Sequence, residues 1–232
     1  MKIKIFSDGA SIDEMVKDYE SGVVSGFTTN PTLMKAAGIT SYIDFAKEAL
    51  DKLGDVPISF EVFADDIGEM YEQGRKLGLL GDNVYIKIPV TNTKGESTGQ
   101  TIRHLSYDGF RVNVTAIMTY PQTIDVCNAL YGGAESVVSI FAGRIADSGI
   151  DPVPVMRRCL SETRMLGNCE LLWASVREVY NIYQAEEIGC NIATATPNIL
   201  RKLKLKGKNL NEYSLETVKM FYNDAKEAGF SV

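Results

Sequence analysis

The chemistry that this sequence could perform begins with Lys87. This lysine lies in the run Asn83-Val84-Tyr85-Ile86-Lys87-Ile88-Pro89-Val90, which otherwise has the composition of a buried strand. Burial removes water from an ammonium group and favours the neutral amine, which can attack a ketone or an aldehyde and form a Schiff base. The alternative, which this segment alone leaves open, is a lysine whose aliphatic stem reaches solvent from an edge strand.

Other apolar segments of the sequence carry polar residues at equivalent positions. Side chains alternate between the two faces of a strand, so an apolar face assigned to surrounding helices leaves the intervening residues pointing inward. In 57–63, for example, Ile58 and Phe60 face the helices and leave Glu61 inward. The predicted inward residues, with those that close the first two strands, are Asp8, Asn30, Ser59, Glu61, Lys87, Asn113, Thr115, Ser139, Phe141, Trp173 and Ser175. Their convergence would surround Lys87 with carboxylates that can accept and donate protons. The alternative is a polar core whose members only hydrogen-bond to one another.

Alternating strand and helix patterns must position these residues. The segments that predict strands are 3–8, 23–28, 57–63, 83–90, 111–117, 136–141, 169–175 and 190–195. Helical patterns lie between and after them, at 11–20, 39–53, 66–78, 98–107, 120–131, 153–166, 178–188, 197–205 and 214–228. Strands that are each followed by helical material predict an α/β fold, a (β/α)8 TIM barrel with extra C-terminal helices.

We predict one barrel domain over residues 1–232, in which 197–232 is a C-terminal helical extension. The alternative is a doubly wound open sheet, which usually carries a glycine-rich nucleotide loop after its first strand. Asp8-Gly9-Ala10-Ser11 lacks the spacing of such a loop. Active sites of (β/α)8 barrels lie at the carboxyl ends of the strands, where most of the inward polar residues fall.

Two arginines predict a phosphate site beside the cavity. Arg144 follows the sixth predicted strand, and Arg177 follows the seventh, two residues after Ser175. Guanidinium groups offer planar, multidentate donors that suit a terminal phosphate. Surface ion pairs are the alternative for each arginine alone.

Composition argues against several classes of partner. The net charge is −6, and the densest basic stretch, 201–208, is short, so we expect no nucleic-acid partner. No apolar run approaches the roughly 20 residues of a membrane span, and the chain begins directly with a strand pattern. We therefore expect a cytoplasmic protein with no membrane partner.

The histidine and cysteine content argues against metal chemistry. The single histidine, His104, rules out a zinc site built from several histidines and is expected at the surface. Four cysteines lack any C-x-x-C spacing, so buried free thiols are expected rather than a metal or redox site.

Several motifs, in order along nearly the whole chain, resemble those of the transaldolase family. They are Thr28-Thr29-Asn30-Pro31, Ile86-Lys87-Ile88-Pro89, Asn113-Val114-Thr115, Ser139-Ile140-Phe141-Ala142-Gly143-Arg144-Ile145 and Ala174-Ser175-Val176-Arg177. The resemblance implies a (β/α)8 barrel and a cofactor-free transfer of a dihydroxyacetone unit between sugar phosphates, the chemistry of the pentose phosphate pathway. The donor would be a ketose phosphate, fructose 6-phosphate or sedoheptulose 7-phosphate, and the acceptor an aldose phosphate.

The resemblance also implies roles for individual residues. Lys87 would form the Schiff base, and Asp8 would take the hydroxyl proton whose loss breaks the carbon–carbon bond. Glu61, with Thr115, would hold the water that moves protons at the imine. The residues with implied substrate-binding roles are Asn30, Asn113, Ser139, Phe141, Arg144, Ser175 and Arg177.

Two other functions stay open on the sequence. Related fructose-6-phosphate aldolases typically have Gln at the position of Glu61, Tyr at that of Phe141 and Lys at that of Arg177, so the residues here favour transfer over release of dihydroxyacetone. A non-catalytic phosphosugar-binding barrel should have lost Lys87 or a carboxylate. The segments 92–99 and 118–124 depart from the small members of the family and leave the acceptor preference open. We also expect a homo-oligomer.

Overall fold

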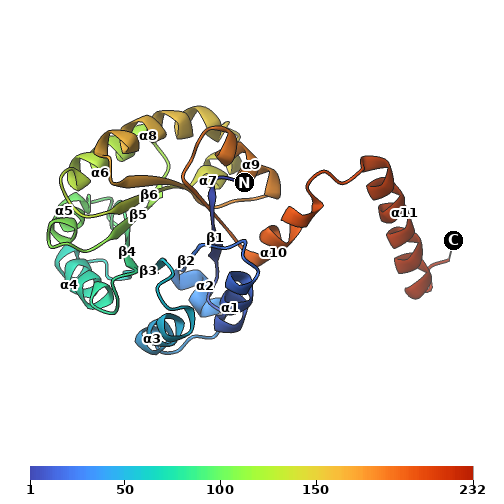
Figure 1. Cartoon of the computed structure of the whole chain (residues 1–232), viewed down its shortest axis with the longest axis horizontal. Coiled ribbons are helices and arrows are strands. Elements are labelled where there is room, and N and C mark those ends of the chain that lie inside the picture. The colour runs from blue at the N-terminus through green and yellow to red at the C-terminus, as the bar shows by residue number, and fades with distance from the viewer. Residues whose placement is uncertain (232) are drawn as a thin grey trace. The chain divides into compact units, whose positions relative to one another are not determined.

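The computed structural model describes residues 1–231, and in that part of the chain eight parallel strands form a closed barrel. Each strand pairs with the next along the sequence, and the last pairs with the first (Figure 1). The predicted (β/α)8 barrel is therefore confirmed. The strands are β1 (Lys4–Asp8), β2 (Gly26–Thr28), β3 (Ile58–Glu61), β4 (Val84–Pro89), β5 (Val112–Ile117), β6 (Ser136–Ile140), β7 (Cys169–Trp173) and β8 (Ile192–Ala195).

Helices surround the barrel strands in Figure 1. Those of the barrel are α1 (Ile12–Glu20), α2 (Pro31–Ala36), α3 (Tyr42–Leu53), α4 (Ile67–Gly78), α5 (Gly99–Tyr107), α6 (Tyr120–Leu130), α7 (Ala142–Asp147), α8 (Pro152–Leu166), α9 (Val179–Glu187) and α10 (Pro197–Leu200). Their apolar faces pack on the outside of the strands, where Ile86, Ile88 and Phe60 are fully buried.

Two short helices, α2 and α7, were absent from the predicted elements. Pro31 occupies the first turn of α2, and the Asn30 side chain caps it by accepting a hydrogen bond from the Leu33 amide at 3.0 Å. Both helices have only six residues, too few to show an amphipathic period. Each directly follows a barrel strand, so each shapes the carboxyl end of the barrel.

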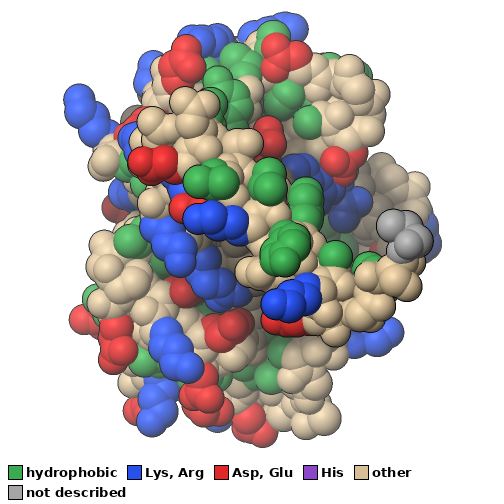
Figure 2. Space-filling view, turned by 90° about the vertical axis from the view of Figure 1, so that its right-hand side faces the viewer, with side chains coloured by type: hydrophobic (Ala, Val, Ile, Leu, Met, Phe, Trp, Pro, Cys, Tyr) green, Lys and Arg blue, Asp and Glu red, His purple; other side chains and the backbone are tan. Residues whose placement is uncertain are grey.

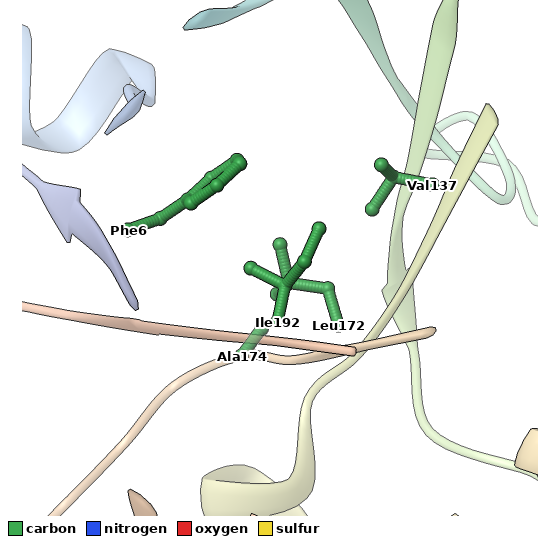
Figure 3. Packing of buried hydrophobic residues seen from close by; sticks show 5 residues of the cluster. All are labelled: Phe6, Val137, Leu172, Ala174 and Ile192. Atoms are coloured by element: carbon green, nitrogen blue, oxygen red, sulfur yellow. The ribbon is translucent and has the colours of Figure 1, made fainter. Parts of the chain in front are cut away.

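Part of the barrel interior is apolar. Phe6, Val137, Leu172, Ala174 and Ile192 point toward one another in Figure 3 and form one buried cluster. Leu172 and Ala174 therefore face inward, and alternation turns Trp173 toward the outside of the barrel. The predicted inward position of Trp173 is wrong, because it assumed that Trp173 shares a face with Ser175, and the positive φ of Ser175 breaks that alternation.

The chain divides into two compact units, Met1–Leu200 and Arg201–Val232, and Val232 lies outside the described residues. The second unit contains a 3-10 helix (Arg201–Leu205) and α11 (Leu210–Glu227), which begins four residues before the predicted helix at 214. Asn209 caps α11 by accepting from the amide of Asn211 at 2.9 Å. No side chain of α11 is buried.

The surface mixes residue types. Figure 2 shows basic, acidic and apolar side chains intermixed on the face that it presents. Tyr213, Val218, Phe221 and Tyr222 of α11 are among the exposed large apolar side chains. No helix within residues 1–231 combines the length and apolar character needed to cross a membrane.

Candidate active site

A polar cavity of about 130 Å³ lies at the carboxyl ends of the strands. Strand ends from both halves of the barrel contribute to it, as expected for an active site of this fold. Its lining residues are Asp8, Thr28, Asn30, Lys87, Thr115, Ser139, Phe141, Arg144, Leu172, Ala174, Ser175 and Thr194. Eight of the predicted site residues are thus brought together, and Lys87 is one of them.

Lys87 lies deep in this cavity and is paired, not isolated. Its side chain is 8% exposed, and its Nζ donates to the Thr29 carbonyl oxygen at 2.8 Å. Glu61 Oε2 lies 3.1 Å from the same nitrogen. The pairing follows from strand register, because Glu61 of β3 stands opposite Lys87 of β4 and both side chains point inward. Glu61 therefore supplies a counter-charge to Lys87, in line with the predicted carboxylates around the lysine.

Glu61 is held at the end of β3 by an aromatic side chain. The Tyr42 hydroxyl donates to the Glu61 carbonyl oxygen at 2.8 Å. Burial raises the pKa of Tyr42, so this hydroxyl stays a protonated donor. Glu61 does not line the cavity itself, yet its carboxylate is adjacent to Lys87, where it can exchange a proton with the lysine.

Asp8 is the second carboxylate facing Lys87, and its surroundings differ. Burial raises the pKa of Asp8, and the Lys87 charge and a hydrogen bond from Thr28 act in the opposite direction. Thr28 Oγ1 donates to Asp8 Oδ1 at 2.7 Å, because Thr28 of β2 stands opposite Asp8 of β1. A carboxyl group with a raised pKa suits reversible proton transfer.

A hydrogen-bonded chain of side chains joins β3, β5 and β6 at the floor of the cavity. Asn113 Nδ2 donates to Ser59 Oγ at 2.9 Å, and Asn113 Oδ1 accepts from Ser139 Oγ at 2.6 Å. These two bonds fix the orientation of the Asn113 amide. Ser139 lines the cavity, whereas Asn113 is fully buried and does not.

The Thr115 hydroxyl is buried without a hydrogen-bond partner in the described part of the chain. Thr115 lines the cavity, and its buried Oγ1 has no hydrogen-bond partner among residues 1–231. The pairing of β5 with β6 is irregular between Val114 and Ile117, and Ala116 has a positive φ of 62°. Such irregularities at strand ends reorient side chains, often at functional sites.

The loops after β6 and β7 are pressed together on the other side of the cavity. A Cβ atom on Gly143 would lie 1.6 Å from the Ser175 carbonyl oxygen, so only glycine fits there. Ser175 has a positive φ of 62°, which breaks the alternation of β7 and brings Ser175 to the cavity. Arg144 follows Gly143, lines the cavity and has its guanidinium carbon 5.7 Å from the centroid of the Phe141 ring.

Arg177 is placed differently from the prediction. It does not line the cavity, and its Nε donates to both carboxylate oxygens of Asp147 at 3.0 Å. The Arg177 hydrogen bonds hold the pKa of Asp147 below its ordinary value. Both side chains are about half exposed. Arg144 is thus the arginine that faces the cavity, and Arg177 is neutralised by Asp147, a residue that the sequence reasoning missed.

The long segment 92–99 is ordered at the same end of the barrel. Thr91 and Ser97 form an antiparallel bridge, and Thr93 Oγ1 donates to Asp65 Oδ2 at 2.8 Å. The Thr93 amide donates to Asp65 Oδ1 at 2.7 Å. The segment is therefore fixed to the loop between β3 and α4.

The sequence reasoning missed four residues that line the cavity. Thr28 is the last residue of β2, and Thr194 is the last but one of β8. Both have inward parity, from which their place in the cavity could have been predicted. Leu172 and Ala174 are apolar and gave no such signal.

The predicted surface position of His104 and the buried free thiols are confirmed. Burial raises the pKa of Cys190 to about 12, which makes it an inert structural thiol.

Comparisons with known proteins assign this arrangement to a family. The profile described as Transaldolase/Fructose-6-phosphate aldolase matches residues 5–232. The chain belongs to the transaldolase/fructose-6-phosphate aldolase family. It is therefore an enzyme of this family, and the resemblance of its motifs is confirmed.

Relatives match the chain over most of their length. A probable transaldolase of Ruegeria sp. is 33% identical over 231 residues, which cover 99% of this chain and 100% of that relative. A probable transaldolase of Dehalococcoides mccartyi is 34% identical over 202 residues, covering 87% of this chain and 90% of the relative. One from Thermoplasma volcanium is 34% identical over 208 residues, with 87% of each chain covered. These relatives are thus similar to this chain over 87% to 99% of its length.

Proposed function

We propose that the protein is a Schiff-base transaldolase that moves a dihydroxyacetone unit from a ketose phosphate to an aldose phosphate. The observation that carries the proposal is Lys87, which lies in a polar cavity with carboxylates on two sides. A lysine amine is the side chain suited to capture a ketone as an imine. Two carboxylates in different surroundings supply separate proton carriers for the steps before and after carbon–carbon cleavage.

The first half of the proposed reaction forms the imine. Glu61 accepts a proton from the Lys87 ammonium, and the neutral Nζ attacks the ketose carbonyl carbon. The resulting carbinolamine loses its hydroxyl group as water when Glu61 returns the proton, which leaves a protonated imine. We assign the holding of that water to Thr115, whose buried hydroxyl is unpartnered within residues 1–231.

The second half breaks and remakes a carbon–carbon bond. Asp8 takes the proton of the hydroxyl group next to the bond that breaks, and the bonding electrons move into the imine to give an enamine on Lys87. The aldose phosphate leaves, an acceptor aldehyde enters, and the enamine attacks its carbonyl carbon while Asp8 returns its proton. Hydrolysis of the new imine then frees the ketose product.

We assign substrate binding to the rest of the cavity. Asn30, Ser139 and Phe141 line it and suit contacts to the dihydroxyacetone unit, and Asn113 orients Ser139. Arg144 and Ser175 suit the phosphate. Arg177 would reach the phosphate only by leaving Asp147. A homo-oligomer and a cytoplasmic location stay predictions.

Product analysis with fructose 6-phosphate, with and without erythrose 4-phosphate, tests the proposal. A transaldolase yields the seven-carbon ketose phosphate in the presence of the four-carbon acceptor and little free dihydroxyacetone in its absence. Release of dihydroxyacetone at similar rates in both reactions would identify the aldolase instead. Binding of the substrate without any product would identify a non-catalytic phosphosugar-binding barrel.

A further inference from the structure

Three side chains from neighbouring strands form a hydrogen-bonded chain that ends at Asp8. Thr28 Oγ1 donates to Asp8 Oδ1 at 2.7 Å, and it lies 2.6 Å from Thr194 Oγ1 of β8. Both hydroxyls are buried, with residue exposures of 2% for Thr28 and 5% for Thr194, and both line the cavity. The Thr194 hydroxyl is thus linked to Asp8 through the Thr28 hydroxyl.

Counting hydrogens gives the direction of the chain. A hydroxyl group has one hydrogen to donate and can accept as well. When Asp8 is ionised, the Thr28 hydrogen is used on Asp8, so the 2.6 Å contact requires Thr194 to donate to Thr28. A hydroxyl that accepts a hydrogen bond becomes a stronger donor, so the second bond reinforces the first.

We infer that Thr194 is a positioning residue that acts through the Thr28 hydroxyl to hold Asp8 in its proton-accepting state. The inference rests on the proposed function for its consequence, because Asp8 is the base in that reaction. The charged groups that face Asp8 across the cavity are Lys87, which is paired with Glu61, and Arg144. The threonines of the chain come from β2 and β8, which supply no charge to the cavity lining.

Removing the hydroxyls one at a time tests the inference. Thr28→Val removes the direct donor, and the pH at which Asp8 titrates is expected to rise by about one to two units. Thr194→Val removes only the reinforcing donor, so a rise of a few tenths of a unit is expected. Thr194→Ser keeps the hydroxyl and should restore the wild-type titration.

A matched control and a double variant complete the design. Thr101→Val removes another buried threonine hydroxyl, which donates to the Ile67 carbonyl oxygen at 3.2 Å outside the cavity, and should leave Asp8 unchanged. In the Thr28→Val/Thr194→Val protein the second change should add nothing, because Thr194 acts through Thr28. If Thr194→Val does not fold, Thr194→Ala provides the same comparison.

The readouts are the carbon-13 carboxyl titration of Asp8, assigned with Asp8→Asn, and the acid limb of kcat/KM. Matching rises in both for Thr194→Val, absent in Thr194→Ser and Thr101→Val, support the inference. An unchanged Asp8 titration in Thr194→Val overturns the inference. It is also overturned if Thr194→Val raises the pH at which Asp8 titrates by the same amount in the Thr28→Val protein as in the wild type. The carboxyl titration needs no turnover, so it tests the inference even if the wild-type protein fails the transfer assay and the proposed function falls.

Discussion

The two sides of the cavity present a carboxylate to Lys87 in different ways. On the side formed by β3 and β4, Glu61 lies 3.1 Å from the lysine nitrogen and forms an ion pair with it. On the side formed by β8, β1 and β2, Asp8 is held by threonine hydroxyls, and burial raises its pKa. The Glu61 carboxylate is thus paired with a cation, whereas the Asp8 carboxyl group accepts a hydrogen bond from a neutral hydroxyl.

This difference shows how one lysine can be served by two proton carriers. A carboxylate in an ion pair exchanges protons with its own partner, which here is the nitrogen that must gain and lose them. A carboxyl group among neutral donors, with a raised pKa, exchanges protons with whatever enters the cavity. Environment, more than residue type, separates the expected role of Glu61 at the imine from that of Asp8 at the substrate hydroxyl.

The largest expected effect is that of Asp8→Asn. Asparagine keeps the shape of the side chain but accepts no proton, so carbon–carbon cleavage should slow by roughly 10²- to 10⁴-fold. Imine formation depends on the other side of the cavity and should continue. Two measurements on the same variant, the single-turnover rate of cleavage and borohydride trapping at Lys87, check that cleavage is lost while imine formation continues. Loss of trapping together with cleavage would show that the two sides do not have separate roles.

Arg144→Ala should weaken phosphate binding without changing the division between the carboxylates. Loss of a charge-assisted contact costs about 1.5–3 kcal/mol, or roughly 10- to 150-fold in kcat/KM for phosphorylated substrates. Arg177→Ala should have a smaller effect, because Arg177 is paired with the exposed Asp147. Kinetics with fructose 6-phosphate and with unphosphorylated dihydroxyacetone provide the comparison. Equal losses on both donors would remove the phosphate role of Arg144.

Glu61→Gln tests the carboxylate on the side of the cavity formed by β3 and β4. The amide still holds water but carries no proton between Lys87 and the imine. We expect the ratio of transfer to dihydroxyacetone release to fall by up to about tenfold, as loss of one charged hydrogen bond would allow, with Lys87 still trappable. The product ratio at fixed acceptor concentration measures this. If both rates fall together at an unchanged ratio, Glu61 does not control the partition.

The smallest expected effect concerns stability and pH. Because burial raises the pKa of Asp8 above its unfolded value, the native protein binds more protons than the unfolded chain between the two values. The contribution of Asp8 to stability is therefore full below its unfolded pKa of about 3.9 and is lost as the pH rises through the native value. Denaturant unfolding should show Asp8→Asn gaining on the wild type as the pH rises over this window. A constant difference at all pH values would contradict the raised pKa.

Much of this arrangement could be predicted from the sequence. Alternating strands and helices identified the barrel, and inward parity identified Lys87, Glu61 and Thr115, because each stands among apolar neighbours of clear alternation. Parity failed at Trp173, which was assigned the same face as Ser175, because the positive φ of Ser175 breaks the alternation there. Ser175 reaches the cavity only through this positive φ, and a serine in the sequence gives no signal of such a backbone conformation.

Pairings between distant segments were beyond the sequence. The ion pair between Glu61 and Lys87 depends on the register of β3 against β4, and register follows from the closed barrel, not from either strand alone. The contact between Asp147 and Arg177 joins residues 30 positions apart. The contact between Thr28 and Thr194 joins the second strand to the last across β1. Each of these contacts changes what a predicted residue can do.

Borohydride reduction with fructose 6-phosphate, followed by peptide mass spectrometry, tests the central claim most directly. The account predicts a reduced sugar adduct on the peptide that contains Lys87 in the wild type, and neither adduct nor transfer in Lys87→Arg, which keeps the positive charge but forms no imine that turns over. Turnover without an adduct, an adduct on another lysine, or activity that survives in Lys87→Arg would contradict it.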